Sequence, residues 1–114
     1  MKNSDPIPIV LKKIATLLRE EEFSSQASAI LTLREAALSS DPDRQAFFRK
    51  EITSNKYYWL GMGTIADICF QDKLLNQRFL AAYHELSIAC EKDDLGSIYS
   101  RDVADVFGKW VTKK

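Results

Sequence analysis

The chain has 114 residues, of which 46% are apolar and 28% charged, and its 16 basic and 16 acidic side chains cancel. A single domain of this size buries about 65% of the surface that its unfolded chain exposes, so it needs no metal or disulfide to fold. Balanced charge argues against nucleic acid as a partner, because phosphate binding requires a surplus of Lys and Arg. The chain shows no signal peptide and no run of about 20 apolar residues, so we expect a cytoplasmic protein with no membrane partner.

Apolar residues spaced three and four apart predict a first helix from about residue 7 onwards. Lys12, Lys13 and Arg19 fall on its other, solvated side. An acidic run ends this helix near the negative end of its dipole, which local electrostatics would not choose. Two interpretations of the run stay open, a solvated surface and a patch that meets a cationic partner. The predicted inner stripe is Ile7, Val10, Leu11, Ile14, Leu17 and Leu18, and the acidic run is Glu20, Glu21 and Glu22.

Two further helices are predicted in the first half of the chain. A serine after Phe23 is expected to cap an alanine-rich second helix, which forms an antiparallel hairpin with the first. Asp41 followed by Pro42 predicts the start of a third helix, which fades near residues 53–55. The inner residues of the second helix are expected to be Ala27, Ile30, Leu31, Ala37 and Leu38, and the third helix contains Phe47, Phe48 and Ile52.

The second half of the chain carries a long helical pattern and a shorter one. The long pattern runs from about Thr64 to Cys90, with a break predicted near residues 71–73, either as a bend or as a second N-cap. A last helix is expected after Ser100. Because no segment alternates with period two, the sequence predicts an all-α fold, a single-domain bundle of five or six helices over residues 1–114. The stripe of the last helix is expected to be Val103, Val106, Phe107, Trp110 and Val111.

A glycine-containing turn stands between an aromatic cluster and the long helical pattern. Gly61 and Gly63 bracket Met62, which predicts a turn with constrained backbone geometry. Thr64 is expected to cap the following helix as its N-cap, and Asp67 to interact with the positive end of the helix dipole. The sequence therefore predicts a structural turn and cap at this point.

The aromatic cluster of Tyr57, Tyr58 and Trp59 has two possible uses. It can pack against the core and fix the entry angle of the long helix. It can also bind a partner, since tyrosine and tryptophan dominate interface hot spots. Exposure of Tyr57, Tyr58 or Met62 would favour an interface, and burial would assign the cluster to the scaffold.

No motif in the sequence indicates a catalytic, metal or cofactor site. The glycine turn lacks the third glycine and the preceding strand of a dinucleotide fingerprint, and no phosphate-binding loop is present. His84 is the only histidine, without a companion at ligand spacing. Cys69 and Cys90 are expected to be a reduced, buried and inert pair on apolar helical faces. We therefore expect a protein that is not an enzyme and has no cofactor.

The ten residues from Trp59 to Ile68 resemble the aromatic-Gly-Gly-Met-Gly-Ser-hydrophobic-Asn-Asp-hydrophobic turn of a family of small bacterial helical proteins. Some members of that family look like immunity proteins of bacterial toxin systems. Its second glycine, methionine and third glycine correspond to Gly61, Met62 and Gly63, and its hydroxyl residue and final acid to Thr64 and Asp67. Leu60 and Ala66 depart from the pattern. The resemblance implies a protein partner.

The leading interpretation is a non-catalytic protein-binding module, an immunity-like protein that neutralises a toxin domain by steric and electrostatic occlusion. One alternative is a small-molecule binder or enzyme with a pocket near Met62 and Asp67, favoured by a cavity that Asp67, Tyr83 or His84 lines. Another is a structural homo-oligomer, favoured by an exposed apolar stripe such as one on the last helix. Acidic loop residues Asp93 and Asp94 would assist encounter with a basic toxin. The candidate partner-binding residues are Tyr57, Tyr58, Trp59, Met62, Glu20, Glu21 and Glu22.

Overall fold

Five α-helices and two short 3-10 helices make up most of the chain. The structure is a computed structural model that describes residues 6–59 and 63–112, with side chains as far as residue 109. The described part contains no strand, which confirms the all-α prediction. In chain order the elements are α1 (Pro6–Glu20), α2 (Ser24–Leu38), α3 (Pro42–Ser54), η1 (Lys56–Tyr58), η2 (Ile65–Asp67), α4 (Lys73–Lys92) and α5 (Ile98–Thr112).

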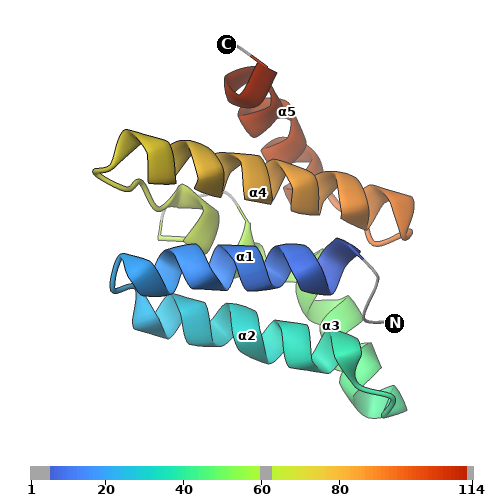
Figure 1. The fold of residues 1–114 in the computed structure, drawn as a ribbon. Coiled ribbons are helices and arrows are strands. Elements are labelled where there is room, and N and C mark those ends of the chain that lie inside the picture. Colours follow the sequence, from blue (N-terminus) through green and yellow to red (C-terminus); the bar gives the residue numbers. More distant parts are fainter. Residues whose placement is uncertain (1–5, 60–62, 113–114) are drawn as a thin grey trace.

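Helix α1 lies between α2 and α4 (Figure 1) and packs against both of them. It runs antiparallel to each, so that α1 and α2 form the predicted helical hairpin. The predicted stripe of α1 is confirmed, because every member of it is buried except Leu17, which is half-buried. One helix therefore contributes side chains to two helix–helix contacts.

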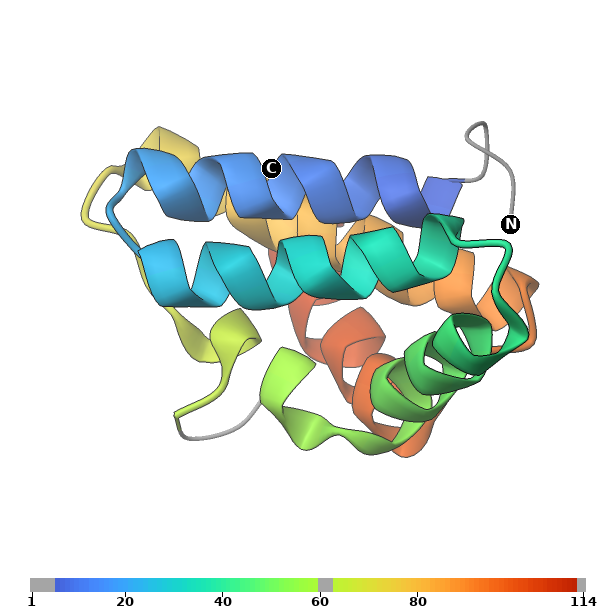
Figure 2. The same ribbon diagram turned by 90° about the horizontal axis from the view of Figure 1, so that it is seen from below.

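Helices α3 and α5 cross beneath this layer and close the bundle (Figure 2). Helix α3 packs against α2, α5 packs against α4, and α3 and α5 meet each other. Between α3 and α4 the chain passes through η1 and then η2, and η2 lies near the end of the bundle where α4 begins. The Cα radius of gyration is 13.2 Å, close to the value of about 13 Å expected for a compact body of this length.

The inner faces of α2, α3 and α5 differ in part from the predicted ones. In α2, Leu33 and Ala36 are buried in addition to the predicted Ala27, Ile30 and Ala37, whereas Leu31 and Leu38 are only half-buried. In α3 and α5, Phe47 is 43% exposed and Val106 is 39% exposed. The side chains of Trp110 and Val111 lie outside the described residues. Helical spacing alone did not select which of several apolar neighbours faces inwards.

Helices α1 and α4 end in the same backbone arrangement. Glu22 follows α1 with φ 66° and Asp94 follows α4 with φ 62°. The N–H of Phe23 donates to the carbonyl of Leu18 at 2.8 Å, and the N–H of Leu95 donates to that of Cys90 at 2.7 Å. These are Schellman turns, in which the left-handed position usually holds glycine. Glu22 and Asp94 thus occupy strained positions for L-residues.

The helix starts confirm one predicted cap and the predicted break before α4, and they correct two predicted caps. Asp41 caps α3 by accepting from the N–H of Asp43 at 3.1 Å, as predicted, with Pro42 at the first helical position. The predicted serine cap of α2 is wrong, because Phe23 occupies the N-cap position and no side chain caps the helix. Thr64 precedes only the short η2 and makes no capping bond there. The chain breaks at the predicted point, and Asp72 caps α4 by accepting from the N–H groups of Leu74 and Leu75.

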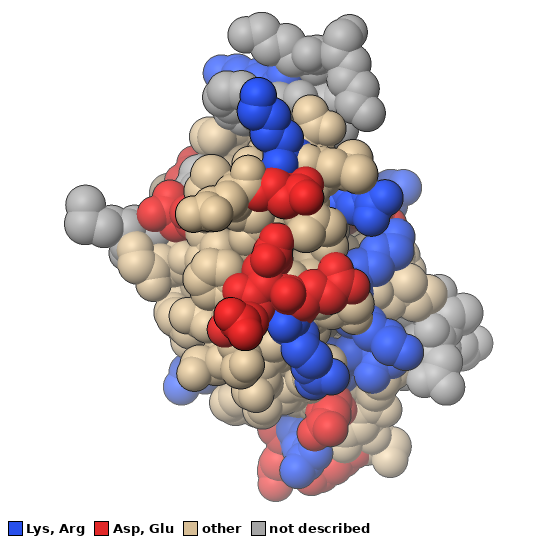
Figure 3. Space-filling model, turned by 60° about the vertical axis from the view of Figure 1, so that its left-hand side comes forward, with Lys and Arg blue, Asp and Glu red and all other residues tan. Residues whose placement is uncertain are grey.

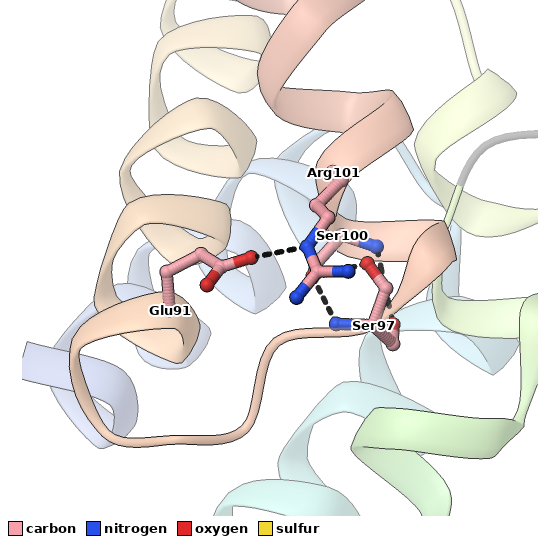
Figure 4. Close-up of polar contacts among 4 residues, drawn as sticks. All are labelled: Glu91, Ser97, Ser100 and Arg101. Carbon is pink, nitrogen blue, oxygen red and sulfur yellow. Dashed lines mark hydrogen bonds and ion pairs between the residues drawn. The ribbon is translucent and has the colours of Figure 1, made fainter.

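The last helix begins earlier than predicted, at the corner between α4 and α5 (Figure 4). The hydroxyl of Ser97 accepts from the N–H of Ser100 at 3.3 Å, and the hydroxyl of Ser100 accepts from the N–H of Ser97 at 2.8 Å. This is a reciprocal capping box in which serine replaces the usual Glu or Gln. Arg101 also donates from Nε to the Glu91 carboxylate at 2.7 Å. The corner is thereby linked to the end of α4.

The capping of α4 predicts that Asp72 and Asp67 contribute differently to stability. We expect Asp72→Ala to lower the free energy of unfolding by about 1 kcal/mol, because two N–H groups lose their acceptor. We expect Asp67→Ala, which removes an exposed carboxylate, to change it by less than about 0.5 kcal/mol. Urea denaturation of the two variants measures the difference. Equal destabilisation by both would contradict the assignment of the cap to Asp72.

Candidate functional site

The aromatic turn contributes two of its three rings to the interior. Trp59 is 0% exposed and donates from Nε1 to the carbonyl of Ile52 at 2.9 Å. That carbonyl belongs to the last turn of α3, where a helix cannot pair its own acceptors. Tyr58 is 7% exposed, and burial is the main factor that raises the pKa of its hydroxyl. Burial of both side chains corrects the prediction that Tyr58 and Trp59 contact a partner, and assigns them to the scaffold.

Tyr83 of α4 lies at the centre of the aromatic core. Its ring makes edge-to-face contacts with Trp59 at 6.1 Å, Phe79 at 5.2 Å and Phe107 at 6.3 Å between centroids. Its hydroxyl is buried and has no hydrogen-bond partner among the described residues. Burial raises the pKa of Tyr83 well above its ordinary value. The cluster connects the turn with both C-terminal helices, so the turn is part of the core packing.

A small hollow remains beside the turn. Tyr57 is 38% exposed, and Gly63 adopts the left-handed conformation expected of it, with φ 78°. The hollow has a volume of about 240 Å³, which is below the range of about 300–1,000 Å³ usual for ligand pockets. Gly61 and Met62, predicted members of the turn and of the pocket beside it, lie outside the described residues. The hollow is lined by Gln26, Tyr57, Gly63, Thr64, Asp67 and Ile68.

The acidic candidates fall at two separate ends of the molecule. Glu20 is the last residue of α1, and Glu21 and Glu22 lie in the turn that leads to α2. The ring of the adjoining Phe23 stacks on Phe70, just before α4, with 5.8 Å between centroids. Asp93 and Asp94 follow the other end of α4, about 30 Å away by the length of that helix. Figure 3 brings the first end forward and shows acidic side chains gathered at its centre, with basic side chains beside and below them. The fold therefore does not unite the predicted acidic residues.

An open groove runs along the outward side of α1, between α4 and α2. Its volume is about 800 Å³, within the range of known binding sites. The apolar floor includes Ile9, which is 45% exposed, together with Leu17, Ala81 and Ala82. The charged lining consists of Lys12, Lys13, Glu20, Arg34, Arg78 and Glu85.

The charge of the groove is predominantly positive. Lys13 pairs with Glu85 across α1 and α4 at 3.4 Å, with both side chains about half exposed to solvent. Lys12, Arg34 and Arg78 form no ion pair with any described residue. Arg34 reaches from α2 and donates from Nε to the carbonyl of Pro8 at 3.1 Å, which holds its guanidinium beside α1. Four cationic groups from three helices thus face two carboxylates.

The apolar spacing in α1 predicts a solvated face for Lys12 and Lys13 and indicates no site there. One signal was present in the sequence, because Ile9 is an apolar residue on that otherwise charged face. The contributions of Arg34 and Arg78 had no such signal. They arise from the packing of three helices, which spacing along one helix does not determine.

The reactive side chains lie apart from one another. Cys90 is buried, and burial raises its pKa to about 12, whereas Cys69 is exposed, which corrects the prediction of two buried thiols. His84 packs against Gly108, where an added Cβ would lie 3.2 Å from the His84 Nε2. The described residues hold no group of three His, Cys, Asp or Glu side chains placed to bind a metal.

No helix among the described residues has the length and apolar character to cross a membrane.

No protein-family model, curated protein or solved structure matches the chain.

The role of Trp59 can be separated from that of Tyr57 by stability measurements. We expect Trp59→Phe to lower the free energy of unfolding by about 2 kcal/mol, because the buried Ile52 carbonyl loses its donor. Tyr57→Phe keeps the ring at a partly exposed position, so it should change stability by less than about 0.5 kcal/mol. Urea denaturation measures both variants. A Trp59→Phe protein with the same free energy of unfolding as the parent protein would contradict the scaffold role of the indole.

The buried hydroxyl of Tyr83 yields a second stability test. Because this group is desolvated and has no hydrogen-bond partner among the described residues, we expect Tyr83→Phe to leave stability unchanged or to raise it by about 1 kcal/mol. Thermal denaturation of the variant and of the parent protein measures the change in stability. A loss of more than about 1 kcal/mol would instead show that the hydroxyl has a partner in solution, and would revive the small-molecule pocket.

Proposed function

We propose that this protein acts by binding another protein and performs no chemistry of its own. The observation that carries the proposal is the groove along α1, which is open, has an apolar floor and is bordered by charged side chains from three helices. An apolar groove between helices is the geometry that accepts a helix from a partner. Small-molecule binding is less well supported, since the hollow at Asp67 is small and neither space is lined by Tyr83 or His84.

The proposed binding surface differs from the one predicted from the sequence. Tyr58 and Trp59 offer almost no surface to a partner, because their side chains are buried in the core. The groove offers exposed Ile9 and half-buried Leu17 as apolar contacts in their place. Glu20 lines the groove at its acidic end, so one predicted acidic candidate remains part of the proposed surface.

The narrower role that we propose is that of an immunity-like protein, which neutralises a toxin by covering its active surface. The resemblance of residues 59–68 to the turn of a family of small bacterial helical proteins, some of which look like immunity proteins, supports this role. The exposed Glu20, which lines the groove, and the exposed Glu22, two residues further along the chain, also support it, because exposed carboxylates accelerate encounter with a basic surface. In this mechanism the groove holds the partner and the acidic end steers it.

Site-specific photo-crosslinking in the source cell tests protein binding. A photo-reactive amino acid replaces Ile9 or Ala81 in the groove, and in matched controls it replaces Phe47 on α3 or Val106 on α5. We expect light-dependent adducts with one protein from the groove positions and none from Phe47, because only the groove brings a partner into contact. Mass spectrometry of the adducts identifies the protein and the crosslinked segment.

Each result of this experiment bears on the proposal. Equal trapping from Phe47 and from Ile9, or no trapping from the groove, would contradict it. An adduct of twice the chain mass from Val106 would favour a homo-oligomer, since Ile98 is 69% exposed and lies two helical turns from Val106 on α5. If the trapped protein is toxic when expressed alone, protection by the parent chain supports the immunity-like role, and continued toxicity contradicts it.

A further inference from the structure

We infer that the segment bound in the groove is an amphipathic helix of the partner, with acidic side chains on both flanks of its apolar stripe. This inference rests on the proposed function and specifies the chemistry of the partner. Its grounds are the length of the groove, the size of its floor residues and the distribution of charge around it.

The groove has the dimensions of a short helix. Its lining residues on α1 run from Ile9 to Glu20, which corresponds to about 16 Å, or three helical turns. Ala81 and Ala82 form the α4 side of the floor, and small side chains let a neighbouring helix approach closely. Ile9 and Leu17 lie about two turns apart and match apolar side chains at positions i and i+7 or i+8 of an occupant.

Cationic groups stand on both sides of this floor. Arg34 lies on the α2 side and Arg78 on the α4 side, with Lys12 on α1. None of these three forms an ion pair with a described residue. The Lys13–Glu85 pair is exposed at both ends, and such pairs contribute about 0–1 kcal/mol, so Lys13 can exchange partners at little cost. Carboxylates along two flanks of an occupant would satisfy these groups.

Two acidic side chains in the groove argue against a polyanion. Glu20 and Glu85 are both part of the lining, and a nucleic acid would bring successive phosphates close to them. The protein also has no net positive charge to offset that repulsion. A helix places its charges at discrete positions, so it can present carboxylates to Lys12, Arg34 and Arg78 and leave the acidic positions free.

Binding of two designed peptides to the full chain tests the inference. Both peptides have four helical turns and the same leucine stripe; one carries glutamate on both flanks and the other carries lysine at the same positions. Glutamate and lysine have similar helix propensities, so the peptides differ mainly in charge. Fluorescence anisotropy should show at least tenfold tighter binding of the glutamate peptide, and the difference should shrink when salt is raised from about 0.05 M to about 0.3 M.

Matched variants locate the binding. Lys12→Glu with Arg78→Glu should weaken binding of the glutamate peptide at least tenfold, because two exposed groove cations are reversed. Arg44→Glu with Lys50→Glu makes the same change of charge on exposed positions of α3, away from the groove, and should leave the affinity unchanged. Thermal denaturation confirms that both variants are folded.

Several results would overturn the inference. They are equal binding of the two peptides, failure of the glutamate peptide to bind, and equal weakening by the groove and α3 variants. The crosslinking experiment distinguishes this failure from failure of the proposed function. A trapped protein whose crosslinked segment lacks acidic residues would overturn the acidic-helix inference and leave protein binding in place, whereas absence of any trapped protein would overturn the function itself.

Discussion

The packing of α1 between α2 and α4 is the contact on which the rest of the structure depends. The inward side of α1 buries Ile7, Leu11 and Leu18 completely. Its outward side is left as the floor of the groove, because α2 and α4 stand on either side of it. The inner face of α1 thus stabilises the fold, and its outer face forms part of the proposed binding surface. Changes to the inner face would alter both.

The aromatic turn has a structural role that its unusual composition did not reveal. Trp59 pairs a carbonyl at the end of α3 and contacts Tyr83 of α4, which in turn contacts Phe107 of α5. A connecting segment without a long helix of its own thereby joins three helices. Large aromatic rings suit this position because each buries a large area, and the indole adds one directional hydrogen bond. Tyr57 alone of the three predicted aromatic contacts remains accessible.

Acidic and basic side chains gather at particular places on the surface of this protein, although its net charge is zero. Glu20, at the end of α1, lines the groove together with its cationic residues, and Figure 3 shows basic side chains beside and below a group of acidic ones at this end of the molecule. Encounter with a partner depends on such local fields, which a sum over the whole chain cannot reveal. The balanced composition therefore carried no information about the local charge of the groove.

The sequence by itself determined the helical class, the α1 stripe, the α1–α2 hairpin, the α3 cap and the break before α4, because these depend on spacing and capping within a few neighbouring residues. It left open whether Tyr58 and Trp59 face the core and whether the break before α4 is a bend or a second N-cap, and it wrongly predicted that Cys69 is buried. Those outcomes depend on which apolar groups find space among helices that are distant in the chain. The groove also depends on the tertiary structure, since Arg34 and Arg78 join Lys12 only when α2 and α4 pack against α1.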